Sequence, residues 1–101
     1  MTDLKSGLYV VATPIGNLGD ISARALEVLG AAKKIACEDT RITGKLLSRF
    51  SITTLMTAYH DYNAEKVRPG LLAEMRDGAA IALVSDAGMP AISDPGYKLI
   101  Q

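Results

Sequence analysis

Short apolar runs alternate along the chain with segments whose apolar residues recur at helical spacing. A short, uninterrupted apolar run is typical of a strand that is buried on both faces. Such runs predict strands over residues 8–12, 34–37, 53–59 and 79–84. Helices are predicted to begin at the capping residues Asp20, Asp39 and Ser93, and to cover residues 64–76. The alternation of strand and helix predicts an α/β fold with a mostly parallel sheet.

The predicted helices differ in how clearly they show an apolar face. The first carries Ile21, Ala25, Leu26, Val28 and Leu29 on one side, and the second carries Ile42, Leu46, Leu47 and Phe50. In the third, Pro69 and Gly70 weaken the middle of the helix or mark a late start, because proline lacks the backbone donor that a helix interior needs.

Two loops that follow predicted strands are rich in Gly, Pro and Asp. They cover residues 13–20 and 85–96. Parallel sheets bind their ligands at the carboxyl ends of the strands, where both loops lie. Neither loop matches the glycine pattern of a dinucleotide site or the Gly-Lys-Ser/Thr of a phosphate loop, so neither ligand class is favoured. The spacing alone is equally consistent with tight turns that need Gly and Pro.

Composition and charge narrow the class of protein. The chain has 101 residues, 49% of them hydrophobic and 22% charged, which is typical of one ordinary globular domain. A formal net charge of zero weighs against a dedicated nucleic-acid-binding domain, although it leaves room for a local basic face. No apolar run is long enough for a membrane span and no secretion signal is visible, so we expect no membrane partner. The single cysteine, Cys37, permits no internal disulfide, fits a buried apolar position and indicates the cytoplasm.

Three segments resemble the signatures of one enzyme family. They are residues 12–21 (ATPIGNLGDI), residues 38–41 (EDTR), and residues 83–88 (LVSDAG) continuing to 93–96 (SDPG). In this order and spacing they are similar to the 16S ribosomal RNA cytidine 2'-O-methyltransferase branch of the tetrapyrrole methylase superfamily. Met89 departs from the pattern, which usually has Thr there, and Ala64 stands where an acidic residue is common.

The resemblance implies an architecture, a cofactor and a substrate. It implies that residues 1–101 are the N-terminal α/β domain of a two-domain fold, with S-adenosylmethionine held between the domains and a homodimer as the assembly. The chain stops within a segment of helical character, which also indicates a fragment. We therefore expect a methyltransferase acting on 16S ribosomal RNA or the small ribosomal subunit, inactive as these 101 residues alone.

The cofactor residues are assigned by similarity. The methionine end of S-adenosylmethionine is expected near Asp86, Ala87, Gly88 and Met89, with Pro14 completing the wall. Gly88 would permit close approach of the backbone to the ligand. No metal site is expected.

Asp39 and Arg41 are the candidate catalytic residues. A ribose hydroxyl is a poor nucleophile until a base accepts its proton, and a carboxylate at the end of the second strand is a candidate for that base. Asp39 is equally explained as a helix cap, and Glu38 as a partner of Arg41. His60 is more consistent with a structural role than with that of a base.

Arg41, Lys45 and Arg49 recur every four residues, which predicts one basic stripe on the second helix. A solvated helix face and a phosphate-binding surface both explain it. Two other functions also stay open, namely a methylase of tetrapyrroles or other small molecules, and a non-catalytic module for dimerisation or RNA docking.

Overall fold

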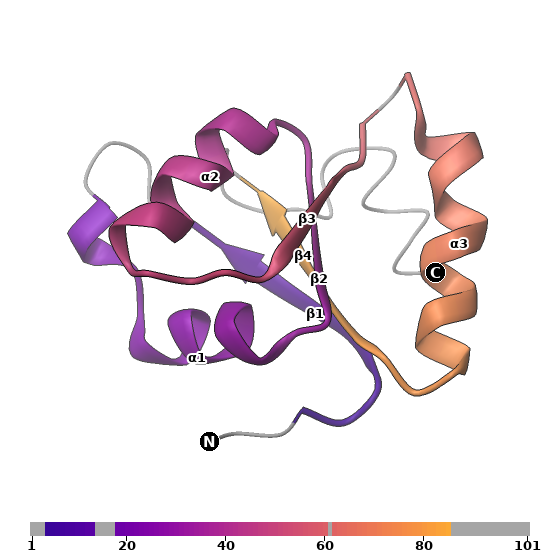
Figure 1. Ribbon diagram of the computed structural model, residues 1–101, viewed down its shortest axis with the longest axis horizontal. Helices are drawn as coiled ribbons and strands as arrows, with labels where there is room; N and C mark the ends of the chain where they lie inside the picture. Colours follow the sequence, from indigo (N-terminus) through magenta and orange to yellow (C-terminus); the bar gives the residue numbers. More distant parts are fainter. Residues whose placement is uncertain (1–3, 14–17, 61, 86–101) are drawn as a thin grey trace.

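A four-stranded parallel sheet forms the centre of the molecule (Figure 1). The computed structural model describes residues 4–13, 18–60 and 62–85. The strands are β1 (Gly7–Ala12), β2 (Lys34–Cys37), β3 (Leu55–Ala58) and β4 (Ala80–Ser85), in the order β1-β4-β2-β3. All three strand pairs are parallel, which confirms the predicted α/β fold. β3 is shorter than the predicted 53–59 and pairs only with β2.

Within the described ranges, three α-helices and one short 3-10 helix lie between the strands. They are η1 (Leu18–Asp20), α1 (Ala23–Ala31), α2 (Thr40–Arg49) and α3 (Ala64–Arg76). Asp39 caps α2 as predicted, but the prediction that Asp20 caps the first long helix is wrong. Asp20 ends η1, and the Ser22 hydroxyl accepts a hydrogen bond from the Ala25 amide at 3.0 Å. Both residues are good caps, and the path of the chain after η1 selects the later one.

α3 runs without interruption through Pro69 and Gly70. It begins at Ala64, so the alternative of a late start is wrong. Pro69 and Gly70 both face solvent, whereas Ala64 and Leu71 are buried against the sheet. Packing of this face outweighs the local loss of a backbone donor. The helix predicted to open at Ser93 lies outside the described residues.

The helices cover the two faces of the sheet unequally. α1 and α2 pack on one face and α3 on the other (Figure 1). The connections from β1 to β2 and from β2 to β3 advance in one direction across the sheet, and the connection from β3 to β4 returns. Because parallel crossovers are right-handed, reversing direction places the connecting helix on the opposite face. None of the helices in the described ranges is both long and apolar enough to cross a bilayer.

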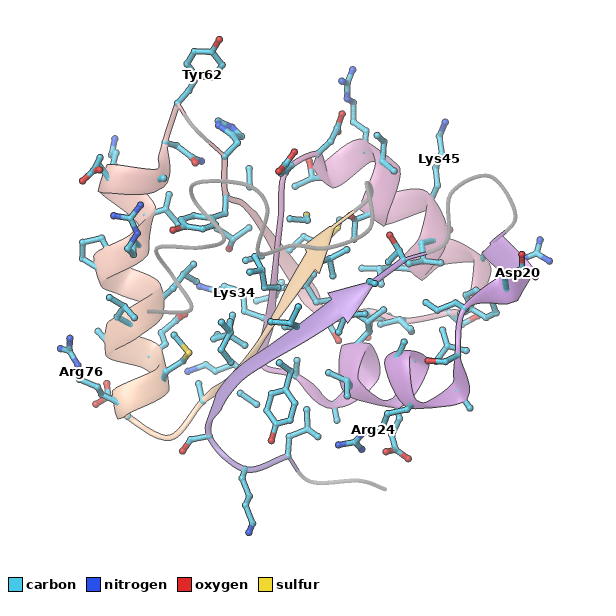
Figure 2. All side chains as sticks on the ribbon, turned by 180° about the vertical axis from the view of Figure 1, so that it is seen from behind. Asp20, Arg24, Lys34, Lys45, Tyr62 and Arg76 are labelled. Atoms are coloured by element: carbon cyan, nitrogen blue, oxygen red, sulfur yellow. The ribbon has the colours of Figure 1, made fainter. Side chains whose placement is uncertain are left out.

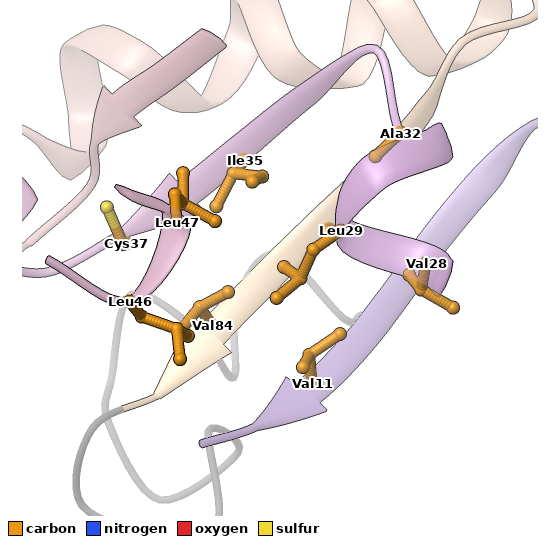
Figure 3. Close-up of a cluster of buried hydrophobic side chains, with 10 residues drawn as sticks. Val11, Val28, Leu29, Ala32, Ile35, Cys37, Leu46, Leu47 and Val84 are labelled. Carbon is orange, nitrogen blue, oxygen red and sulfur yellow. The ribbon is translucent and has the colours of Figure 1, made fainter. Parts of the chain in front are cut away.

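Side chains that alternate along the strands build two cores. Under α1 and α2, Ile35 and Cys37 of β2 and Val84 of β4 contact Leu29 and other buried apolar residues (Figure 3). On the α3 side lie Ala36 of β2 and the β4 residues Ile81 and Leu83. This alternation is the two-residue period of a strand buried on both faces. Cys37 is buried, as predicted.

The apolar face of α2 is rotated from the predicted one. Ile42 is 51% exposed, so its predicted place in the core is wrong, and the neighbouring Thr43 is buried instead. Positions 43, 46, 47 and 50 form a single helical stripe, of which Leu46 and Leu47 reach the core. A stripe through position 42 fits the same spacing rule, so only the packing of α2 on the sheet distinguishes the two.

Candidate functional site at the carboxyl edge of the sheet

The carboxyl ends of the strands bring the sequence-predicted segments to one edge. Ala12, the last residue of β1, is paired in register with Ser85, the last of β4. Cys37, the last of β2, is paired with Ala58 of β3 and Val84 of β4. Adjacent strands are about 4.8 Å apart, so the segments that follow them start close together.

The predicted cofactor residues follow directly from this edge. The residues themselves lie outside the described part of the chain; they are Pro14, Asp86, Ala87, Gly88 and Met89. Of their neighbours, Thr13 is buried at the end of β1, and Ser85 ends the paired strand β4. The two segments therefore begin at adjacent strands and at the same level, on the edge where parallel sheets bind their ligands.

Asp39 and Arg41 form a closed local pair at the start of α2. The Asp39 Oδ1 atom accepts hydrogen bonds from the Arg41 backbone amide at 2.9 Å and from Nε at 3.2 Å, and Oδ2 accepts one from Nη2 at 3.0 Å. One carboxylate thus caps the helix and binds the guanidinium through both oxygens. The alternative that Glu38 pairs with Arg41 is wrong, since the partner is Asp39.

The Asp39–Arg41 pair favours the charged forms of both groups. Hydrogen bonds from the Arg41 side chain, and then from its backbone, hold the pKa of Asp39 below its ordinary value. The same contact raises the pKa of Arg41. A carboxylate with a lowered pKa is a weaker base, whereas an oriented guanidinium is a good anion ligand. The side chain of Arg41 is 87% exposed and therefore accessible to a ligand.

The lowered pKa predicts how stability depends on pH. Because the folded-state pKa of Asp39 lies below its ordinary value of about 3.8, Asp39 stabilises the fold above that pH. The contribution is lost as the pH falls through the lower folded-state pKa. We expect Asp39→Asn in the full-length protein to keep the cap and to lose this dependence. Urea unfolding across a pH series would measure it, and parallel pH profiles for parent and variant would contradict the assignment.

The basic stripe of Arg41, Lys45 and Arg49 lies on the solvent side of α2, as predicted. All three side chains are exposed, and Lys45 projects away from the helix (Figure 2). Arg49 lies over the Phe50 ring, with 5.8 Å from its guanidinium carbon to the ring centroid. Within the described part of the chain, only Arg41 of the three has an acidic partner. The stripe therefore keeps most of its positive charge available.

The turn between β3 and α3 also starts from this edge, and it contains Asn63, whose role was not predicted from the sequence. Asn63 holds this turn, since its Oδ1 accepts from the His60 amide at 2.8 Å and its Nδ2 donates to the Ala58 carbonyl at 2.8 Å. His60 Nδ1 accepts from the Tyr62 amide at 3.3 Å, in accord with the predicted structural role. The available signal was an Asn three residues after His60, just before a helix, which is typical of a side chain that closes a turn.

The described residues also bear on cofactor and metal binding. No group of three or more His, Cys, Asp or Glu side chains within residues 4–13, 18–60 and 62–85 is arranged to hold a metal ion. Among the described residues, the Asp39–Arg41 pair is a charged group at this edge.

Comparison with known proteins identifies strong similarity over nearly the whole chain. A protein of Mesorhizobium japonicum is 55% identical over 97 residues, one of Synechocystis is 58% identical over 93, and one of Escherichia coli O157:H7 is 56% identical over 94. The matches cover 96%, 92% and 93% of this chain, and each relative is called ribosomal RNA small subunit methyltransferase I. The chain spans about a third of the length of these relatives, since the match covers 33% of each.

The family assignment rests on a second match, to a protein-family model. The model of the tetrapyrrole (corrin/porphyrin) methylases matches residues 7–101. This range begins at the first residue of β1 and includes the carboxyl edge with all three signature segments. The parallel sheet agrees with the fold that the resemblance implied. On these grounds the chain belongs to the tetrapyrrole methylase family.

Proposed function

We propose that this chain is part of an S-adenosylmethionine-dependent methyltransferase that methylates the ribose 2'-hydroxyl of a cytidine in 16S ribosomal RNA. The observation that carries the proposal is the identity of 55–58% to proteins named as small-subunit ribosomal RNA methyltransferases. The exposed basic stripe beside the carboxyl edge supports an anionic polymer as the substrate. The homodimer is a prediction from the resemblance, and the cytoplasmic location is a prediction from the single cysteine.

The chemistry divides between a bound methyl donor and a positioned acceptor. S-adenosylmethionine supplies an activated methyl group on a sulfonium, and in-line transfer depends mainly on alignment of the two reactants. We assign the donor site to Pro14, Asp86, Ala87, Gly88 and Met89. The register of β1 with β4 supports this assignment, because it starts both segments side by side.

Arg41 and Asp39 receive separate roles. We propose that Arg41 binds a phosphate next to the reacting ribose and that Asp39 orients its guanidinium. The bidentate contact and the lowered pKa of Asp39 support orientation over proton acceptance. The Asp39→Asn variant also separates these roles. Loss of turnover at unchanged RNA affinity would make Asp39 the base, whereas weakened RNA binding would fit the orienting role.

A methylation assay with the full-length protein tests the proposed function. Assembled small ribosomal subunits would be incubated with S-adenosylmethionine that carries a labelled methyl group, and the RNA then digested to nucleosides. The expected product is a cytidine labelled on its ribose. A label on the base, or transfer only to an added tetrapyrrole, would overturn the proposal.

Asp86 gives the sharpest test of the donor site. We expect Asp86→Ala in the full-length protein to weaken S-adenosylmethionine binding about ten- to a hundredfold, because a charged hydrogen bond contributes about 1.5–3 kcal/mol. Isothermal titration calorimetry would measure the affinity, and circular dichroism would check the fold. Asp77→Ala, at the exposed end of α3, is a matched control. Unchanged affinity in a folded Asp86 variant would remove this residue from the site.

A further inference from the structure

The turn between β3 and α3 presents an unusually exposed aromatic side chain. Tyr62 is 98% exposed and projects from the body of the molecule (Figure 2). Tyr59, in the same turn, is 1% exposed. A single exposed apolar group is common on protein surfaces, so exposure alone indicates nothing. Tyr62 is distinguished by the hydrogen-bonded residues on either side of it and by its place in the fold.

The turn that carries Tyr62 is anchored on both sides. Before it, the Tyr59 amide donates to the Cys37 carbonyl at 2.8 Å, and the Tyr59 hydroxyl accepts from Arg68 Nε at 2.9 Å. After it, the Asn63 side-chain oxygen accepts a hydrogen bond from the His60 backbone amide. The Asn63 backbone amide in turn donates to the His60 carbonyl at 3.1 Å. These bonds hold Tyr59, His60 and Asn63 in place before any ligand arrives, which lowers the entropy cost of binding beside them.

The His60 ring lies next to the Tyr62 ring. Their ring centroids are 6.0 Å apart and their planes meet at 69°, an edge-to-face arrangement. Because Tyr62 is 98% exposed, this contact leaves its ring accessible for stacking.

The turn starts from the same edge of the sheet as α2, the helix that carries the cationic stripe. β2 and β3 are paired at Cys37 and Ala58, so the residues leading to Arg41 and to Tyr62 emerge from adjacent strands. The chain then turns to α2 on one face of the sheet and to α3 on the other. Adjacent strands whose connections diverge in this way open the crevice where α/β sheets bind ligands.

We propose that Tyr62, next to His60, is a stacking platform for a base of single-stranded RNA whose phosphates contact Arg41, Lys45 and Arg49. Single-stranded RNA is bound by cations along its backbone and by aromatic rings against its unstacked bases, and this edge supplies both. The proposal rests on the proposed RNA substrate, and it adds a contact that selects an unpaired nucleotide next to the reacting ribose.

The experiment compares two probes on the full-length protein. One is a fluorescently labelled short oligocytidine, and the other is an abasic strand with the same number of phosphates. We expect Tyr62→Ala to weaken oligocytidine binding by about 5- to 150-fold, the usual range for losing one stacked base, and to leave the abasic strand unaffected. Tyr62→Phe keeps the ring and should bind both probes as the parent does.

Each alternative outcome contradicts the proposal in a different way. If the parent protein binds neither probe, RNA recognition itself fails, and the proposed function fails with it. If the parent binds oligocytidine and Tyr62→Ala binds it equally well, only the platform is wrong. If Tyr62→Ala changes the sedimentation of the protein instead, Tyr62 belongs to a protein interface.

Discussion

Replacing Arg41, Lys45 and Arg49 together by Gln should weaken RNA binding by the full-length protein more than any single surface substitution. Each lost phosphate contact lowers the salt slope by about 0.7–0.9, so three contacts correspond to about a 100- to 500-fold loss near 0.1 M salt. The loss should be the same for any RNA sequence, because phosphates carry no sequence information. Affinity for small ribosomal subunits across a salt series would measure both quantities.

A matched control variant removes the same number of positive charges from another part of the surface. Other exposed basic residues are Lys5 and Lys33, each shortly before a strand, and Arg76, which lies on α3 across the molecule from Lys45 (Figure 2). Replacing these three by Gln should alter the salt slope much less. Equal slopes for parent and stripe variant would make the stripe an ordinary solvated face. A parallel fall in S-adenosylmethionine affinity would place Arg41 within the donor site.

The largest effect on stability is expected from Leu29→Ala. Leu29 is 0% exposed and lies in the core between α1 and the sheet, near Val11, Ile35 and Val84 (Figure 3). Truncating a buried leucine removes apolar contacts and leaves a cavity, which lowers the free energy of unfolding by about 2–5 kcal/mol. Natural proteins are stable by only about 5–15 kcal/mol, so this loss would be severe. Urea unfolding of the full-length protein would measure it.

Leu55→Ala is the control for Leu29→Ala, because it makes the same substitution on an exposed edge strand. Leu55 is 69% exposed at the start of β3. Its removal should change the free energy of unfolding by less than about 0.5 kcal/mol. If the two variants lost equal stability, the core under α1 would not be the main support of the sheet.

Both cores meet on strands that also end at the candidate site. β2 contributes Ile35 and Cys37 to one core and Ala36 to the other, and the Glu38–Arg41 segment follows directly. β4 is packed on both faces in the same way before residue 86. Buried strands thus hold the starting points of the predicted binding segments, which supports placing the proposed function at this edge.

The sequence by itself determined the features that depend on neighbouring residues. The alternation of strand and helix, the bounds of α3 and the Asp39 cap were all predicted, because period and capping are local properties. The three signature segments indicated the family by the same kind of local evidence. The exposed position of the basic stripe followed from its helical spacing alone.

Tertiary structure alone decided the features that depend on residues far apart in the chain. It inserted β4 between β1 and β2, and it buried Thr43 in place of Ile42. Asp20 and Ser22 are both suitable helix caps, and only the path of the chain decided that Ser22 caps α1. The carboxyl edge that joins Arg41 to the Tyr62 turn likewise exists only after β2 has paired with β3. These outcomes depend on which surfaces pack together, and that information is spread over the whole sequence instead of lying in any one segment.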